Sequence, residues 1–353
     1  MRTIVVGDIH GCYTELVKLL EKVQLTAADC LISLGDIVDR GPDSVKVYDL
    51  LKNRPNTIVL MGNHERKHLR QTLSYSQEIV RLQFGERYHE FLNWVSTLPY
   101  YHELEAAILV HAAVESDIPM AQQREEVLCG CIADEKYLER RYGQIYWSHS
   151  YTGAKPVIVG HHVVGDSPLI TTQKIYGIDT GACHGGNLTA VILPGFEIVQ
   201  VRSPKDYWRE EIAKWQLPVM QAKPWDSYQW DKIKAMCEEY QGAPYSDLSV
   251  FMAQKRQWMN NLLSLAPIAI RQVEAKLADL ITQYGADGFK KQAHDLPYAT
   301  LLDQANAGQL TPELLQKILS TPDQWLQMMR ILLPADQLGA IQSSPIQSSR
   351  GEG

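Results

Sequence analysis

The chain has 353 residues, of which 45% are hydrophobic and 21% charged, and its formal net charge at pH 7 is −7. This composition is typical of a globular protein with one large domain or two of ordinary size. The negative charge argues against a surface that binds nucleic acid without specificity. No apolar run is long enough to span a bilayer, and the six cysteines are scattered rather than arranged as a disulfide framework. We therefore expect a reduced, cytoplasmic protein.

Three strand–helix units open the chain, and each predicted strand ends in a charged loop that contains glycine. The strands cover residues 2–6, 30–34 and 57–61, and the loops that follow them are Gly7–Gly11, Gly35–Gly41 and Gly62–Glu65. In an open α/β sheet the carboxyl ends of neighbouring strands form the active-site crevice. The repetition therefore predicts one site at this edge of the sheet.

The later elements divide the chain into three parts. A helical stretch over 66–95 is followed by predicted strands at 98–103, 106–110 and 156–159 and by an all-β region over 169–202. Beyond Ser203 the pattern is helical and rich in tryptophan, and the end of the chain is rich in Ser, Gln and Gly. We expect a catalytic domain over 1–202, a helical region over 203–336 and a disordered tail over 337–353.

Side chains that can bind a metal stand at the ends of several of these strands. They are Asp8, His10, Asp36, Asn63, His111 and His161. All offer oxygen or nitrogen and none is a thiolate, which suits Mn²⁺, Fe or Zn²⁺. Six ligands exceed the need of one ion, so the pattern favours two ions about 3.5–4 Å apart, bridged by Asp36 on the middle strand. The alternative is that these residues are only turn, cap and satisfied polar positions.

The three leading motifs resemble the linked motifs of calcineurin-like metallophosphoesterases, and they are most similar to the phosphoprotein phosphatase type. His111 and Gly160-His161 resemble the two later histidine motifs of that family, and Ile178–Ala182 resembles a stretch found in bacterial members. The resemblance covers residues 1–202. It implies an α/β fold, a β-sandwich flanked by helices (αββα), to which this chain adds a C-terminal helical region. It also implies the activity of a bacterial serine/threonine protein phosphatase.

The resemblance implies two divalent metal ions, with Mn²⁺ expected first and Fe or Zn²⁺ as alternatives. The first ion would be held by Asp8, His10 and Asp36, and the second by Asp36, Asn63, His111 and His161. A metal-activated hydroxide would then attack the phosphoester directly, without a phosphoenzyme.

The resemblance also implies the residues that handle the substrate. His64 would be the general acid that protonates the leaving oxygen, and Asp39 would orient it. A histidine suits this role because its pKa lies near physiological pH. Arg40 would bind the phosphate oxygens.

The family pattern is incomplete in three places. Alanines follow His111 where the family has glycine, and no second phosphate-binding arginine is evident, since His149 stands near its place and Arg140 or Arg141 could serve instead. His162 beside His161 leaves the choice of ligand open, although the family pattern favours the first histidine after glycine. The remaining histidines are expected in surface or structural roles: His68, His89, His102, His184 and His294.

The substrate stays open between three classes of phosphoester. A phosphorylated protein, or a small phosphomonoester, is the main prediction. The alternatives are a diadenosine polyphosphate and a nucleic-acid or cyclic-nucleotide phosphodiester. Relatives that hydrolyse diadenosine polyphosphates tend to carry alanine in place of Asp39 and aspartate in place of Glu65, so the acidic residues here favour a phosphomonoesterase. No membrane partner is expected.

The helical region after residue 202 has two interpretations. It is a bundle that packs on the catalytic domain or forms an oligomer contact, or it is a cap that narrows the cleft or recruits a substrate. Its tryptophans suit a core as well as an interface.

Overall fold

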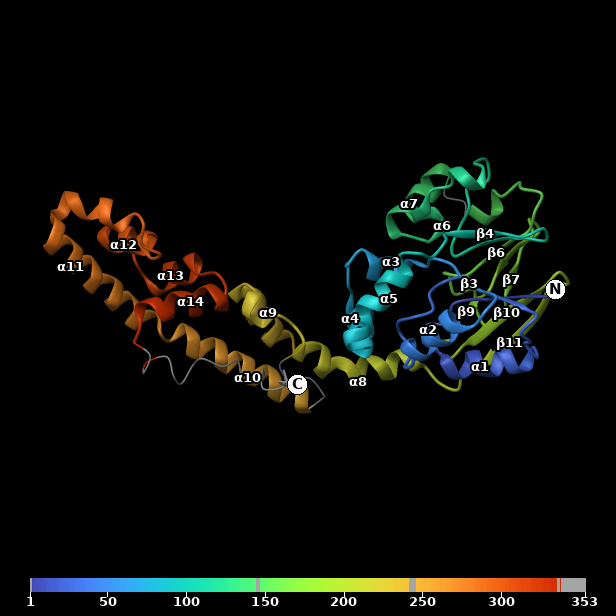
Figure 1. The fold of residues 1–353 in the computed structure, drawn as a ribbon, viewed down its shortest axis with the longest axis horizontal. Helices are drawn as coiled ribbons and strands as arrows, with labels where there is room; N and C mark the ends of the chain where they lie inside the picture. Colours follow the sequence, from blue (N-terminus) through green and yellow to red (C-terminus); the bar gives the residue numbers. More distant parts are fainter. Residues whose placement is uncertain (1, 144–146, 241–245, 335–336, 338–353) are drawn as a thin grey trace. The chain divides into compact units, whose positions relative to one another are not determined.

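The computed structural model describes residues 2–143, 147–240, 246–334 and 337, which belong to two compact units, Met1–Trp215 and Gln216–Gly353 (Figure 1). The division falls within helix α8 (Tyr207–Gln221). The predicted disordered tail, 337–353, lies outside the described residues except for Gln337. None of the described helices is long and apolar enough to cross a membrane.

The first sheet of the Met1–Trp215 unit has a parallel centre. Its strands, in order, are β11 (Glu197–Arg202), β10 (Asn187–Leu193), β1 (Thr3–Val6), β2 (Cys30–Ser33) and β3 (Thr57–Val59), and β9 (Asp179–Thr180) pairs with β10. β1, β2 and β3 run parallel, while β10 is antiparallel to β1. The loops after the three parallel strands therefore leave the sheet at the same edge.

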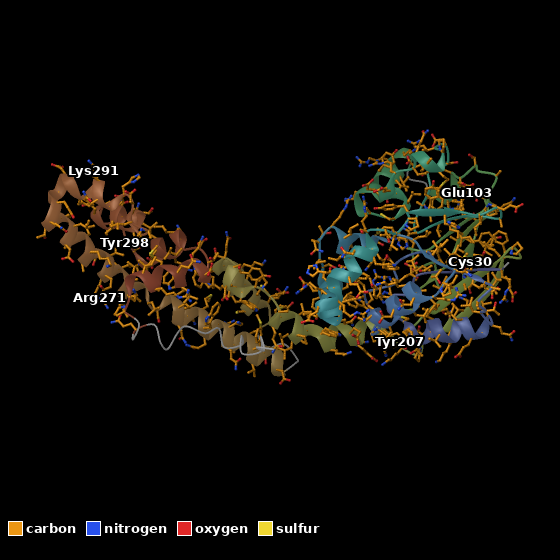
Figure 2. All side chains as sticks on the ribbon, viewed as in Figure 1. Cys30, Glu103, Tyr207, Arg271, Lys291 and Tyr298 are labelled. Atoms are coloured by element: carbon orange, nitrogen blue, oxygen red, sulfur yellow. The ribbon has the colours of Figure 1, made fainter. Side chains whose placement is uncertain are left out.

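The second sheet repeats this arrangement around three further parallel strands. Its order is β4 (Tyr101–Glu103), β5 (Ile108–Val110), β6 (Val157–Val159), β8 (Ile175–Gly177) and β7 (Leu169–Ile170). β5, β6 and β8 are parallel, and β4 and β7 are antiparallel edge strands. Glu103, at the end of β4, lies at the periphery of this unit (Figure 2).

The alternation of side chains along the strands builds two layers of core. Val5 of β1 and Leu109 of β5 belong to one apolar cluster between the sheets, whereas the neighbouring Ile4 packs with Leu16 on the helical side. Successive side chains of a strand point to opposite faces, so a continuous apolar run fills both layers.

Helices cover the outer faces of both sheets (Figure 1). They are α1 (Tyr13–Lys22), α2 (Ser44–Asn53), α3 (Asn63–Leu69), α4 (Tyr75–Phe84), α5 (Tyr88–Val95), α6 (Glu125–Leu128) and α7 (Ile132–Arg141). The predicted αββα sandwich is confirmed.

The Gln216–Gly353 unit is helical in its described part, as the sequence predicts. Its helices are α9 (Trp230–Glu239), α10 (Ser246–Leu263), α11 (Ala266–Ala293), α12 (Ala299–Asn306), α13 (Pro312–Ile318) and α14 (Pro322–Leu332). Two of them begin in the same way: the hydroxyls of Thr311 and Thr321 accept hydrogen bonds from backbone N–H groups in the first turn, and a proline follows each threonine. Arg271 and Tyr298 mark this unit in Figure 2.

Candidate metal centre

Five strand ends bring the predicted ligands to one place. Asp8 and His10 follow β1, Asp36 follows β2, and Asn63 begins α3 just beyond β3. From the second sheet, His111 follows β5 and His161 follows β6. The two sheets therefore both contribute to the site, because their parallel strands end at the same side of the sandwich.

Asp36 lies between two groups of side chains that can each hold a metal ion. The first group is His10, Asp36 and His64, and the second is Asp36, His111 and His161. Within each group the ligand atoms lie within 4.8 Å of one another. The Asp36 oxygens divide between the groups: Oδ2 lies 3.6 Å from His10 Nε2, and Oδ1 lies 3.5 Å from His111 Nε2. A carboxylate placed in this way could contribute one oxygen to each group.

The second group brings two histidine rings to one amide oxygen. His111 Nδ1 donates to the carbonyl oxygen of Leu34 at 3.1 Å, so Nε2 carries the lone pair of the neutral ring. Burial lowers the pKa of His111 to about 4, which keeps the ring neutral at pH 7. Nε2 then faces the Oδ1 atom of Asn63 at 3.1 Å, and His161 Nδ1 lies 3.1 Å from the same oxygen. Imidazole nitrogens and carboxylate oxygens gathered this closely are the donor atoms that bind divalent metals, so the residues fit such an ion.

In the first group, His10 is oriented by a backbone carbonyl, as His111 is in the second. His10 Nδ1 donates to the carbonyl oxygen of Val38 at 2.9 Å, which leaves the Nε2 lone pair directed into the site. Burial, and then the nearby charge of Arg40, lower the pKa of His10 well below its usual value. Burial by itself raises the pKa of Asp36, but His111, His64 and His10 together hold that pKa well below its usual range.

Asp8 lies beside these groups but belongs to neither of them. Its Oδ1 atom accepts a hydrogen bond from the backbone N–H of His161 at 3.0 Å, and its buried Oδ2 atom has no hydrogen-bond partner. Burial, Asp179 and Asp36 all raise the pKa of Asp8. A cation would relieve this concentration of buried carboxylates, so Asp8 also fits a metal site.

His64 and Arg40 face the same centre. His64 Nδ1 lies 2.5 Å from Asp39 Oδ2, so Asp39 holds the ring with Nε2 toward the metal groups. Arg40 contacts His10 Nε2 and His64 Nε2, each at 3.1 Å. A guanidinium at this point can bind the oxygens of a phosphate group. The arrangement places the predicted acid and the predicted phosphate-binding residue together.

The backbone of the site is strained where the chemistry is concentrated. Residues of the site with a positive φ angle include His10 (46°), Asp36 (50°), Asp39 (71°), Arg40 (64°) and His161 (70°). Such conformations are costly for residues other than glycine and persist where the surrounding structure enforces them. Close approach also requires glycine nearby: a Cβ atom on Gly160 would lie 2.0 Å from Asp8 Oδ1, and one on Gly62 would lie 2.2 Å from Asp36 Oδ1.

Glu65 shapes the site through the backbone of its loops. Its fully buried carboxylate accepts backbone N–H groups of Asp36 at 2.8 Å, Ile37 at 2.9 Å and Gly62 at 3.2 Å. Glu65 therefore fixes the loop that carries Asp36. Because the carboxylate is used in this way, the presence of Glu65 says little about the leaving group, although the sequence argument used it to favour a phosphomonoesterase.

The sequence left open the second phosphate-binding arginine and the choice between His161 and His162. Arg141 forms an ion pair with Asp117 at 2.7 Å, and Arg140 donates to the carbonyl oxygen of Lys136, so both guanidinium groups have partners other than the residues of the metal centre. His161, rather than the exposed His162, joins Asp36 and His111.

Sequence reasoning missed two buried residues that contact Asp39. His68 lies on α3 with no exposed surface, and Gln77 lies on α4 and donates to Asp39 Oδ2. One signal was available for His68, which lies four positions after His64 and therefore on the same helical face.

Known proteins similar to this chain include hydrolases of nucleotides. A bis(5'-nucleosyl)-tetraphosphatase PrpE [asymmetrical] of Bacillus cereus is 28% identical over 251 residues, which cover 60% of this chain and 98% of the relative. The corresponding protein of Bacillus mycoides is 29% identical over the same shares.

Solved structures and a family model also match. A candidate diadenosine tetraphosphatase is 28% identical with a TM-score of 0.48, over 57% of this chain and 93% of that one. A serine/threonine phosphatase of Saccharomyces cerevisiae is 14% identical with a TM-score of 0.42, over 57% and 79%. The family model described as calcineurin-like phosphoesterase matches residues 1–185, which contain all six predicted ligands together with His64, Asp39 and Arg40. The chain therefore belongs to the calcineurin-like phosphoesterase family.

Proposed function

We propose that this protein is a dinuclear-metal-dependent phosphohydrolase that cleaves a dinucleoside polyphosphate. The observation that supports the chemistry is the carboxylate of Asp36, whose two oxygens face two separate groups of ligands. The names of the relatives support the substrate, since they favour the diadenosine polyphosphate alternative over the protein phosphatase expected from the sequence.

Each residue then has a role in the proposed reaction. Asp8, His10 and Asp36 would hold one ion, and Asp36, Asn63, His111 and His161 would hold the other. Two bound ions would neutralise charge on the phosphoryl oxygens and make water more acidic. In the structure Arg40 donates to Nε2 of His10 and of His64. With a phosphate present, the guanidinium would turn to the phosphate oxygens. His64, protonated at Nε2, would then give that proton to the departing oxygen while Asp39 holds its Nδ1 proton.

One feature supports a second candidate, a phosphomonoester such as phosphoserine. A serine alkoxide is a poor leaving group and needs a proton, whereas a nucleotide phosphate leaves readily without one. The close contact between His64 and Asp39 therefore suits a reaction with a poor leaving group. The experiment below therefore tests both candidates.

The experiment removes the metal from the whole protein with a chelator, restores Mn²⁺, Fe²⁺ or Zn²⁺ separately, and measures hydrolysis of four substrates. These are diadenosine tetraphosphate, a phosphoserine peptide, p-nitrophenyl phosphate and bis-p-nitrophenyl phosphate. A preference for diadenosine tetraphosphate, with ATP and AMP as products, supports the proposal. A preference for the peptide moves the assignment to a protein phosphatase, and a preference for the diester moves it to a phosphodiesterase. Failure on all four with metal bound contradicts the proposed function.

A further inference from the structure

Behind Asp39 lies a chain of buried hydrogen bonds that the proposed reaction does not use. Asp39 Oδ2 accepts from His64 and Gln77, while Oδ1 faces Nε2 of His68 at 3.0 Å. On its other side, His68 Nδ1 lies 2.8 Å from the hydroxyl of Tyr88. Asp39, His68 and Gln77 have no exposed surface, and Tyr88 is 6% exposed. Water therefore cannot replace any of these contacts without a change in packing.

The proton positions in this chain follow from the chemistry of the atoms. The carboxylate oxygen of Asp39 can only accept, so His68 must carry hydrogen on Nε2. In the neutral ring Nδ1 then accepts a hydrogen bond from the Tyr88 hydroxyl, which burial keeps protonated by raising the pKa of Tyr88 to about 12. Asp39 thus sets the tautomer of His68, Tyr88 holds the opposite nitrogen of the ring, and His68 fixes one oxygen of Asp39.

The packing also fixes the His68 ring. The ring lies edge-on to Phe91, with centroids 5.4 Å apart and an interplanar angle of 86°. His64 and His68 lie four residues apart on α3, so one helical face presents both histidines to the same carboxylate. A carboxylate held at both oxygens cannot rotate, and His64 therefore keeps one orientation toward the reacting centre.

We propose that His68 is a positioning residue for His64: through Asp39 it fixes the ring that donates the proton, and Tyr88 fixes His68. The proposal rests on the role of His64 in the proposed function. A small misplacement of a reacting group can cost about 100-fold in rate. Loss of the His68 contact should therefore slow substrates that need the proton most.

The test compares His68→Leu, which removes the donor to Asp39, with His68→Gln, whose side-chain amide can still donate. Rates are measured on p-nitrophenyl phosphate, phenyl phosphate and a phosphoserine peptide, whose leaving groups become steadily poorer. We expect His68→Leu to lower kcat by about 100-fold on the poorest leaving group and by much less on the best. His68→Gln should recover most of the loss, and metal content should not change. An equal loss on every substrate would overturn the positioning role, because it would indicate only a structural defect.

A double-mutant cycle separates this proposal from the proposed function. If His68 acts through His64, then His68→Leu has no further effect on kcat in a His64→Asn background. A full additional loss in that background would contradict the proposal while leaving His64 as the acid. If His64→Asn itself shows no dependence on the leaving group, the proposed acid fails and the proposal fails with it.

A milder variant with a spectroscopic measurement tests the proposal even if His68→Leu does not fold or the substrates are not hydrolysed. Tyr88→Phe removes only the hydroxyl, and Tyr48→Phe is its control, since the Tyr48 hydroxyl binds Glu90 and Lys52 and does not contact Asp39. The short hydrogen bond from His64 Nδ1 to Asp39 should give a strongly downfield proton resonance. We expect that resonance to shift in Tyr88→Phe and to stay in place in Tyr48→Phe. The same resonance position in both variants would overturn the proposal.

Discussion

The two units of the chain bury very different interiors. The Met1–Trp215 unit buries a set of ionisable side chains at its strand ends, among them Asp8, Asp36, Asp39, His64 and His111. In the Gln216–Gly353 unit the large buried cluster is apolar, with Trp230 and Trp325 in edge-to-face contact, and Lys255 is the one buried charged side chain among the residues described there. Buried charge costs stability unless it is paired, so its concentration in one unit indicates where the chemistry lies.

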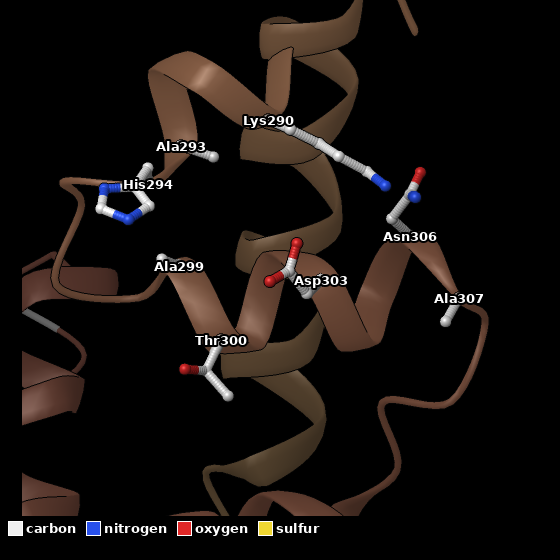
Figure 3. A pocket seen from close by; sticks show the side chains of 8 residues that line it. All are labelled: Lys290, Ala293, His294, Ala299, Thr300, Asp303, Asn306 and Ala307. Atoms are coloured by element: carbon white, nitrogen blue, oxygen red, sulfur yellow. The ribbon is translucent and has the colours of Figure 1, made fainter. Parts of the chain in front are cut away.

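Apart from Lys255, the charged side chains described in the helical unit lie at or near its surface. A hollow between α11 and α12 is lined by Lys290, His294, Asp303 and Asn306, all of them exposed (Figure 3). Both groups of residues able to hold a metal, as far as the described residues go, lie in the first unit. This contrast predicts that changes at the buried ionisable side chains of the metal centre alter activity more than stability, and that changes in the helical core do the reverse.

The largest effect is expected from Asp36→Asn. Mutation of residues that only support metal ligands typically lowers metal affinity by roughly 10- to 100-fold. Removing the charge of Asp36, which would itself be a ligand, should lower metal affinity by more than this, and activity should fall with it. Metal content measured by mass spectrometry, together with the rate on p-nitrophenyl phosphate, checks this. Asp29→Asn is the matched control, because Asp29 pairs with Arg2 at 2.8 Å away from the site. The control should keep metal and activity and lose only thermal stability. Two bound metals in Asp36→Asn would contradict the bridging role.

The next effect is expected from His64→Asn, which keeps a donor near Asp39 but removes Nε2. A general acid contributes about 10²- to 10⁴-fold, so kcat on a phosphoserine peptide should fall within that range. The fall on p-nitrophenyl phosphate should be smaller, because nitrophenolate leaves without a proton. Metal content should stay the same as in the unchanged protein. If all substrates lose activity equally at full metal content, His64 is not the proton donor.

The core of the helical unit provides the opposite test. Trp325 has no exposed surface, and truncation of such a residue leaves a cavity that costs about 3–5 kcal/mol. We expect Trp325→Ala to lower the free energy of unfolding of this unit by that amount and to leave the hydrolysis rate at low temperature unchanged. Hydrogen exchange of the backbone amides of α14 would measure the loss of stability. Trp325→Phe should cost much less, because it keeps the ring and removes an indole N–H that has no partner in the described structure. A large loss of activity in folded Trp325→Ala would show that the two units are not independent in function.

The leading strand–helix units and the position of the site could be predicted because both depend on local patterns, whereas the αββα sandwich was expected from the family resemblance. Apolar runs that end in glycine-containing charged loops predicted β1, β2 and β3, and parallel strands must end at one edge, so Asp8, Asp36 and Asn63 had to lie close together. The helical region followed from periodicity and composition.

Other features could not be predicted because they depend on contacts distant in sequence. Gln77 reaches Asp39 from another helix, and Glu65 turns its carboxylate onto backbone N–H groups rather than into the site. Neither contact leaves a mark in the local pattern. The sequence therefore predicted which residues surround the centre better than it predicted how a residue such as Glu65 is used.

The smallest effect is expected from Lys255→Met, which tests the exception in the helical unit. Lys255 is 3% exposed, and its ammonium lies between 5.1 and 5.5 Å from the rings of Trp225, Phe251 and Trp258. Burial lowers the pKa of Lys255 below its usual 10.5, although Asp226 and Cys237 act in the opposite direction. The charged lysine therefore costs stability at neutral pH, and methionine, which is similar in volume, should be neutral or slightly stabilising.

The sign of the pH dependence makes this prediction specific. Between the lowered pKa and 10.5 the unfolded chain holds more protons than the folded chain, so the free energy of unfolding of the unchanged protein rises with pH in that window. Any advantage of Lys255→Met should therefore be greatest at neutral pH and shrink toward pH 10, as urea unfolding at both pH values would measure. Lys232→Met is the control, since Lys232 also lies on an aromatic ring, 3.7 Å from Tyr228, but is exposed. If the gain in the free energy of unfolding from Lys255→Met instead grew with pH, the rings and Asp226 would stabilise the ammonium. The helical unit would then also contain a buried charge that contributes to its stability.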